Sequence, residues 1–204
     1  MENRISYGII ARQRLNSILK ELFRKSIHIC SSLVPFMLSI AYWPIIGLLL
    51  FALVFYSVCE VLRLKGYSIP VISKVTEVAA RKRDENKFVL GPVTLVIGIL
   101  IAALVLPLDC ARIGIFALSF GDGLASLAGK LFGKITIPGA KGKTVAGSLT
   151  CFLAVYIATF CCCNNCFISL VIAFCAMMIE VLPLSDFDNI LIPVSTGALF
   201  LFLI

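Results

Sequence analysis

Residues 44–62 read PIIGLLLFALVFYSVCEVL, a run in which Glu60 is the one charged side chain. A helix of roughly 20 apolar residues crosses the hydrocarbon core of a bilayer. Similar runs recur along the 204-residue chain, which is 60% hydrophobic and 14% charged with a mean hydropathy of +1.05. Soluble domains average about 25% charged residues. The composition therefore excludes a soluble globule and a disordered chain, and it predicts a polytopic membrane protein.

The apolar runs predict an all-α, polytopic integral membrane protein with about seven transmembrane helices. The expected spans are residues 27–43, 44–62, 89–107, 110–130, 145–163, 166–183 and 188–204. A short amphipathic helix is expected near 70–85, in the polar stretch between the second and third spans. Residues 1–26 alternate apolar and basic side chains at helical spacing, which predicts an interfacial amphipathic helix on an anionic leaflet. The chain thus divides into an N-terminal cytoplasmic segment, 1–26, and a transmembrane domain, 27–204, that carries the candidate site.

The distribution of Lys and Arg predicts the orientation, because these residues accumulate on the cytoplasmic side. Six of the 18 lie before residue 27, seven in 63–88 and four in 130–143. Seven spans would place all three segments on one side and leave only Arg112 on the other. We therefore expect a cytoplasmic N-terminus in a bacterial inner membrane, with lipids as neighbours. The basic blocks alternate with apolar runs, so no nucleic-acid partner is expected.

Three carboxylates fall inside predicted spans, where a charge is costly and marks a functional candidate: Glu60, Asp122 and Glu180. An interhelical hydrogen bond would explain Glu60 equally well. Asp122 is the stronger candidate because Gly121 and Gly123 flank it. A glycine pair in a helix lowers its stability and opens the backbone to close approach of a ligand.

A glycine- and lysine-rich stretch follows at the predicted cytoplasmic boundary, between Gly129 and Ser148. Backbone amides freed by glycine bind anionic oxygens, and lysines add positive charge. Lys143 and Thr144 stand where the fifth span begins, so the positive end of that helix would add to the attraction. The stretch is not a P-loop, because Ile137 occupies a position where that motif needs glycine and no strand precedes it. We expect a polyphosphate site, with a divalent cation bridging Asp122 to the phosphates.

Two further clusters face the same side of the predicted membrane. Glu21, Arg24 (or its neighbour Lys25) and His28 share one helical face. By itself, the single His of the chain is more often a structural hydrogen-bonding group than a base.

The second cluster is an acidic turn between the last two predicted spans. Glu180 precedes Pro183, and Asp186, Asp188 and Asn189 lie between Pro183 and Pro193. The turn is either a helix break with Asp188 capping the last span or a second site that contacts a metal or a ribose.

The order and spacing of these motifs resemble a known family, the CTP-dependent lipid-alcohol kinases. The family includes dolichol kinase, phytol kinase and the CTP-using diacylglycerol kinase, and it is distantly related to CDP-diacylglycerol synthase. The resemblance runs from about residue 20 to the end of the chain. Its carriers are ELFRKSIH at 21–28, FGDGLA at 120–125, Gly129 with FGK at 132–134, KTVAGS at 143–148, and Glu180 with DNILIP at 188–193.

The resemblance implies transfer of the γ-phosphoryl group of CTP, with Mg²⁺, to a membrane-embedded alcohol such as a polyprenol, a phytol-like isoprenoid or diacylglycerol. It implies catalytic roles for Asp122, Lys143 and His28, nucleotide contacts by Arg24, Lys25, Lys134, Thr144, Gly147, Ser148 and Asn189, and metal binding by Asp122, Asp188 and Glu180. In the family, position 146 is Glu-like in dolichol kinases, so Ala146 argues against a dolichol-type substrate.

Two other functions remain open at this point. A cytidylyltransferase would use the same nucleotide but attack its α-phosphorus, and its signature ends in a His-containing turn that residues 186–190 lack. A small transporter would spread charges through the depth of the bilayer and repeat between its halves; neither feature is seen. A homodimer also stays open, and the cysteines at 161–166 are interpreted as packing residues.

Overall fold

The computed structural model describes residues 2–67, 76 and 87–204. Its α-helices are α1 (Glu2–Cys30), α2 (Val34–Ile40), α3 (Tyr42–Leu64), α5 (Gly91–Val105), α6 (Leu108–Phe116), α7 (Gly123–Phe132), α8 (Val145–Cys163), α9 (Cys166–Val181) and α10 (Asp188–Leu203). A 3-10 turn, η1 (Ser31–Leu33), joins α1 to α2, and a π-helical stretch, η3 (Ala117–Asp122), joins α6 to α7. Among these residues the only β-type pairing is an isolated bridge between Thr136 and Thr144. The all-α prediction is confirmed.

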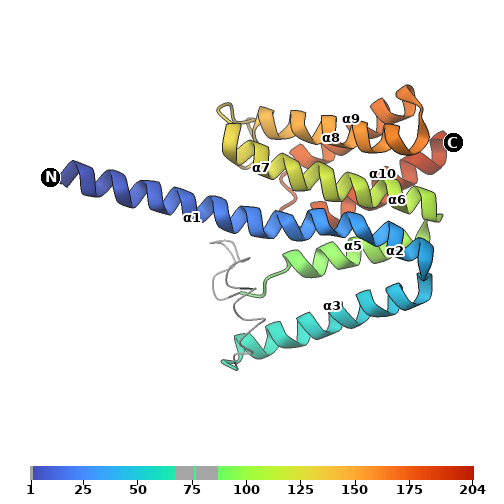
Figure 1. Cartoon of the computed structure of the whole chain (residues 1–204), viewed down its shortest axis with the longest axis horizontal. Coiled ribbons are helices and arrows are strands. Elements are labelled where there is room, and N and C mark those ends of the chain that lie inside the picture. The colour runs from blue at the N-terminus through green and yellow to red at the C-terminus, as the bar shows by residue number, and fades with distance from the viewer. Residues whose placement is uncertain (1, 68–75, 77–86) are drawn as a thin grey trace.

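The helices lie side by side along the long axis, and the chain runs back and forth between the two ends, with α2 continuing α1 and α7 continuing α6 (Figure 1). The first half of α1 projects beyond the bundle at one end. The turn after α3 and the loop from α7 to α8 lie at that same end, whereas the C-terminus lies at the other. The described basic loops therefore share one end of the molecule. Which side of a membrane that end faces stays a prediction.

Three helical segments are long and apolar enough to cross a membrane: Tyr42–Leu64, the continuous Leu108–Phe132 and Val145–Cys163. Helices α5, α9 and α10 are apolar but have only 15 or 16 residues. The predicted span 27–43 is divided among the end of α1, η1 and α2, because the chain breaks its regular helix at Ser31–Leu33 and again at Ala41. Hydropathy counts apolar residues and does not register such breaks. The helices thus do not confirm a count of seven spans.

Two other sequence predictions concern residues 1–26 and 70–85. Helix α1 is continuous through residue 26, so the boundary drawn there falls inside a helix. The amphipathic helix predicted near 70–85 lies outside the described residues.

Large apolar side chains are exposed on the outer helices, among them Trp43, Phe51 and Phe202, as expected for surfaces covered by lipid tails.

Small residues bring α10 against α5 and α6. A Cβ on Gly98 would lie 2.1 Å from the Asn189 carbonyl oxygen, and one on Gly114 would lie 2.1 Å from that of Pro193. Pro193 stands inside α10 and has no N–H to bond the Asn189 carbonyl four residues earlier. Glycine at 98 therefore lets α5 pack directly on the carbonyl that proline leaves open. This packing fixes the first turn of α10, where Asp188 and Asn189 lie.

Candidate active site

A pocket of about 590 Å³ opens between α1, α7, the loop after α7 and the junction of α9 with α10. It brings together predicted site residues from five separate stretches of sequence. They are Arg24, Asp122, Lys143, Thr144, Gly147, Glu180 and Asp188. The juxtaposition on which the sequence prediction depended, of Asp122 with the 143–148 motif, is therefore present.

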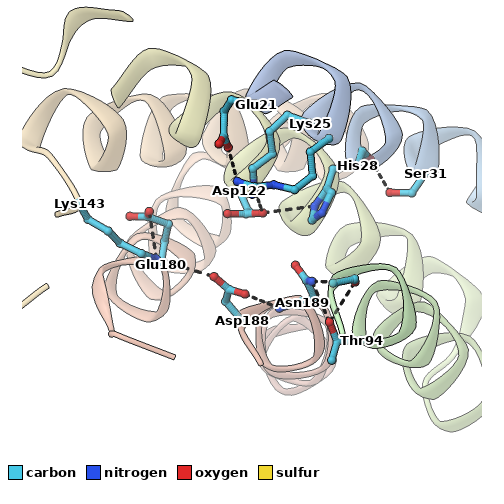
Figure 2. A network of polar contacts seen from close by, with 12 residues as sticks. Glu21, Lys25, His28, Ser31, Thr94, Asp122, Lys143, Glu180, Asp188 and Asn189 are labelled. Atoms are coloured by element: carbon cyan, nitrogen blue, oxygen red, sulfur yellow. Dashed lines mark hydrogen bonds and ion pairs between the residues drawn. The ribbon is translucent and has the colours of Figure 1, made fainter. Parts of the chain in front are cut away.

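Asp122 is the last residue of η3 and is buried against α1. The Lys25 ammonium donates a hydrogen bond to Asp122 Oδ2, and His28 Nδ1 lies 3.2 Å from the same oxygen without the alignment of a hydrogen bond. Figure 2 shows the Lys25 and His28 side chains reaching from α1 to this carboxylate. The side chains of Lys25, Asp122 and His28 are 2%, 5% and 7% exposed. The site thus contains a buried cluster of charged and titratable groups.

The two glycines beside Asp122 serve helix packing. A Cβ on Gly121 would meet Val155 Cγ2 of α8 at 2.7 Å, and one on Gly123 would meet Ile29 Cγ1 of α1 at 3.1 Å. Glycine on both sides thus lets α8 and α1 approach the carboxylate closely. The sequence interpretation, in which the triplet admits a ligand, missed this use.

A hydroxyl pair extends this polar contact beyond the end of α1. Ser31 Oγ of η1 and Ser119 Oγ of η3 are 2.6 Å apart and both side chains are buried. Lys25, His28 and Ser31 recur every three residues (Figure 2), and they contact Asp122 or Ser119 on η3. A π-helical stretch in an α-helix is frequent at functional sites, and here it ends at Asp122.

On the opposite wall of the pocket, Lys143 contacts two carboxylates. Its ammonium lies 3.2 Å from Glu180 Oε1 and 3.8 Å from an Asp188 carboxylate oxygen, and it also donates to the Glu180 carbonyl. Ser148 donates to Glu180 Oε2 at 3.1 Å. One lysine therefore lies between two carboxylates from different helices (Figure 2), and Ser148 fixes one of them.

The glycine-rich loop closes around Thr144. Thr144 caps α8 by accepting a hydrogen bond from Gly147 N at 3.2 Å. The helix begins at Val145, as the sequence predicted. A Cβ on Gly129 or Gly133 would lie within 3.0 Å of Thr144 Oγ1. These glycines therefore pack the loop against α8. Gly142, with φ of +85°, lines the pocket with open space around it.

Five predicted site residues do not line the pocket. Lys25 and His28 contact the Asp122 carboxylate, and Ser148 bonds the Glu180 carboxylate, from outside the pocket lining. The Asn189 amide donates to Thr94 Oγ1 at 2.9 Å and to the Gly91 carbonyl at 3.3 Å, so it joins α10 to α5. Lys134 is exposed on the loop. The structure does not bring the last two into the pocket.

The structure adds pocket residues that the sequence did not single out as site residues. Glu21 accepts from Arg24 at 2.5 Å and lies 3.5 Å from the Lys130 ammonium, which donates to the Ser17 carbonyl at 2.6 Å. The other additions are Ser126, Thr136, Lys141 and Ser185. The basic loop gave a signal for Lys130 and Lys141. The small hydroxyl residues, Ser126 in α7 and Thr136 and Ser185 in the loops, gave none.

Glu60, the third intramembrane carboxylate, lies outside the pocket. Both its oxygens accept from the Arg63 guanidinium, at 2.8 and 2.7 Å, and one also accepts from Val89 N at 2.9 Å. It therefore joins the end of α3 to the residues before α5. Of the two readings left open by the sequence, the structural one fits this geometry.

The donor set fits a magnesium ion that arrives with phosphates. Among the residues that the structure describes, no group of three or more His, Cys, Asp or Glu side chains could hold a metal ion alone. Glu180 and Asp188 nevertheless share one ammonium and line the same pocket. Mg²⁺ is often bound by one or two carboxylates together with substrate phosphates. The protein would supply that number of ligands here.

The fold and site define an all-helical protein with apolar, membrane-length helices and a charged pocket at the end of the bundle. No family model and no solved structure matches the chain. Curated relatives do. A wheat (Triticum aestivum) protein named probable phytol kinase, chloroplastic, is 29% identical over 94% of this chain and 69% of its own length.

Two other relatives match a shorter part of the chain. A soybean (Glycine max) protein named probable phytol kinase 1, chloroplastic, is 30% identical over 67% of this chain and 46% of its own length. An uncharacterized protein of Methanocaldococcus jannaschii is 29% identical over 67% of this chain and 69% of its own length. The two relatives named phytol kinase confirm the resemblance to the lipid-alcohol kinase family of the CTP-dependent type.

Proposed function

We propose that this protein transfers the γ-phosphoryl group of CTP to a membrane-embedded lipid alcohol, giving a lipid phosphate and CDP. The observation that carries the proposal is that Arg24, Lys143 and the start of α8 line one pocket together with the carboxylates of Asp122, Glu180 and Asp188. Phosphoryl transfer needs cations to bind the nucleotide phosphates and carboxylates for the metal and the acceptor. The pocket provides both.

The phosphates would bind at the basic wall of the pocket. Arg24 and Lys143 supply positive charge, and the first turn of α8 supplies backbone N–H groups beside Gly147. Lys143 already bonds Glu180 and lies near Asp188. A phosphate bound there would share the ammonium with these carboxylates, which supports a role for Lys143 in the reaction.

Glu180 and Asp188 would hold Mg²⁺, which neutralises the charge of the transferring phosphoryl group. Asp122, across the pocket, would accept the proton of the alcohol. The contacts support this assignment of roles. The Asp122 carboxylate lies beside two side chains, Lys25 and His28, whereas Glu180 and Asp188 share the Lys143 ammonium and lie close enough to bind the same ion.

An isoprenoid alcohol of the phytol type is the first acceptor to test, because two relatives are named phytol kinase. The apolar helices would keep its tail in the bilayer while its hydroxyl reaches the pocket. CTP is soluble and charged, so it would enter from the end that carries the basic loops. We place that end in the cytoplasm.

In the test, purified protein in lipid is incubated with phytol, a polyprenol or diacylglycerol as the acceptor. The donor is γ-labelled or α-labelled CTP, and γ-labelled ATP at the same concentration is the control for donor preference. Label in the lipid from the γ position alone is the expected result. Label from the α position would identify a cytidylyltransferase instead. Label from neither position, in protein that binds CTP, would refute the kinase proposal and favour a transporter.

A further inference from the structure

Lys25 is a buried cation that the proposed reaction does not use. Its side chain is 2% exposed and does not line the pocket. Its ammonium crosses from α1 to η3 and is bonded to a carboxylate 97 residues away. A buried ammonium is costly unless it is paired, so the pairing with Asp122 explains why Lys25 is tolerated there.

The two oxygens of Asp122 have different surroundings. Oδ2 has both neighbours, the Lys25 ammonium and His28 Nδ1. Within residues 2–67, 76 and 87–204, Oδ1 has no hydrogen-bond or ion-pair partner. Asp122 itself lines the pocket. One oxygen is therefore held by α1, and the other is available to a ligand.

Close contacts hold the backbone on both sides of this bond. Gly123, the first residue of α7, lets α1 pack beside Asp122, because a Cβ there would press on Ile29. Ser31, in η1 directly after α1, and Ser119 of η3 add a hydroxyl contact of 2.6 Å one turn further from the pocket. With both backbones fixed, the Lys25 bond determines how the carboxylate is turned about its Cβ–Cγ bond.

We propose that Lys25 is a positioning residue. It holds Asp122 through Oδ2 and presents Oδ1 to the hydroxyl of the acceptor alcohol. The inference rests on the proposed function and assigns the acceptor to a particular atom. As the alcohol oxygen bonds to the γ-phosphorus, its proton passes to Oδ1, and the bond from that phosphorus to the bridging oxygen breaks with its electron pair leaving on CDP.

The test compares wild-type protein, Lys25→Met, Asp122→Asn and the double variant by steady-state kinetics in lipid. Loss of a positioned proton acceptor costs about 100-fold or more in kcat, so Lys25→Met is expected to lose about that much while its KM for CTP changes less than about threefold. Lys25→Arg is expected to recover part of the rate. Because Lys25 acts through Asp122, the double variant is expected to be no slower than Asp122→Asn alone.

Ser119→Ala is the matched control, since it removes a buried polar contact between η3 and η1, the turn that follows α1, without touching Asp122. Its kcat is expected to stay within about threefold of wild type. An equal loss in Ser119→Ala and Lys25→Met would show a general loosening of α1 and would overturn the inference. So would a tenfold rise in the KM for CTP in Lys25→Met with an unchanged kcat, which would make Lys25 a nucleotide ligand.

If Lys25→Met does not fold, equilibrium binding of labelled CTP is compared between Asp122→Asn and the double variant, which removes both buried charges. Equal affinities support the inference, and a tenfold weaker double variant overturns it. Wild-type protein that transfers no γ-label would refute the proposed function itself. Wild-type transfer with an unaffected Lys25→Met would refute only the role of Lys25.

Discussion

The Lys143 ammonium lies 3.2 Å from Glu180 Oε1, a carboxylate 37 residues further along the chain at the end of α9. The contact ties the loop before α8 to the turn before α10. Lys141, on the same loop, reaches the Pro183 carbonyl at 3.5 Å. Two loops that are distant in sequence therefore form one wall of the pocket. In that wall, Lys143 is the cation that contacts the Glu180 and Asp188 carboxylates.

Replacing Lys143 with alanine is expected to abolish detectable turnover and to raise the dissociation constant for CTP about tenfold or more. The substitution removes a phosphate-binding cation and leaves Glu180 and Asp188 without their shared partner. Kinetics and labelled-CTP binding give both values. Lys134→Ala is the control, because this exposed lysine on the same loop does not line the pocket. Equal defects in both variants would argue against a specific role for Lys143.

Asp122→Asn is expected to lower kcat at least about 100-fold while the protein still binds CTP. Asparagine keeps the shape of the side chain but cannot accept a proton. The variant also leaves Lys25 buried without its counter-charge, so a lower melting temperature is expected alongside the catalytic loss. A wild-type rate in this variant would remove Asp122 from the mechanism.

Ser148→Ala is expected to raise the Mg²⁺ concentration needed for half-maximal activity several-fold. The hydroxyl holds Glu180 Oε2 at 3.1 Å, and partners that orient a metal ligand typically change affinity by about tenfold or more. Thr150→Ala is the control, because Thr150 lies on the same helix and its hydroxyl donates to the Ala146 carbonyl one turn earlier, away from Glu180. Identical Mg²⁺ curves for Ser148→Ala and wild type would contradict the placement of the metal at Glu180.

Gly98→Ala is expected to destabilise the fold by about 1–3 kcal/mol, because overpacking displaces backbone. Its Cβ would lie 2.1 Å from the Asn189 carbonyl oxygen. Gly47→Ala on α3 has open space and is expected to be neutral or stabilising by up to about 1 kcal/mol. Thermal unfolding in detergent compares the two. A neutral Gly98→Ala would show that α5 and α10 do not pack as closely as described.

The orientation can be tested with the native cysteines. Cys161, Cys162 and Cys166 are exposed around the turn from α8 to α9, at the end of α8 opposite the basic loop. If the basic end is cytoplasmic, a membrane-impermeant maleimide should label them from outside intact cells. Lys134→Cys in a cysteine-free background should be labelled only in inverted vesicles. The reverse pattern would invert the predicted topology.

Much of the site could be predicted from the sequence because its chemistry is concentrated in few polar residues. A carboxylate flanked by glycines in an apolar run, and a Gly-Lys stretch at the start of a helix, are visible without coordinates. The structure brings Asp122, Lys143, Thr144, Glu180 and Asp188 to one pocket. The start of α8 at Val145 agrees with the predicted span.

What the sequence missed depends on helix packing. The same residue type can bind a ligand or join two helices, and only the neighbours decide. Asn189 bonds Thr94 of α5, and Gly121 and Gly123 make room for α8 and α1. The break at Ser31–Leu33 is equally invisible to hydropathy, because the residues around it stay apolar. These features required the arrangement in space.

Helix α1 runs unbroken from Glu2 to Cys30 and carries Lys25 and His28 near its inner end. Its outer half stands clear of the bundle (Figure 1). Because the helix is unbroken, its outer half and the residues that contact Asp122 belong to a single element. A molecule that bound the N-terminal end of α1 would therefore bind the same helix that carries Lys25, about 20 residues away.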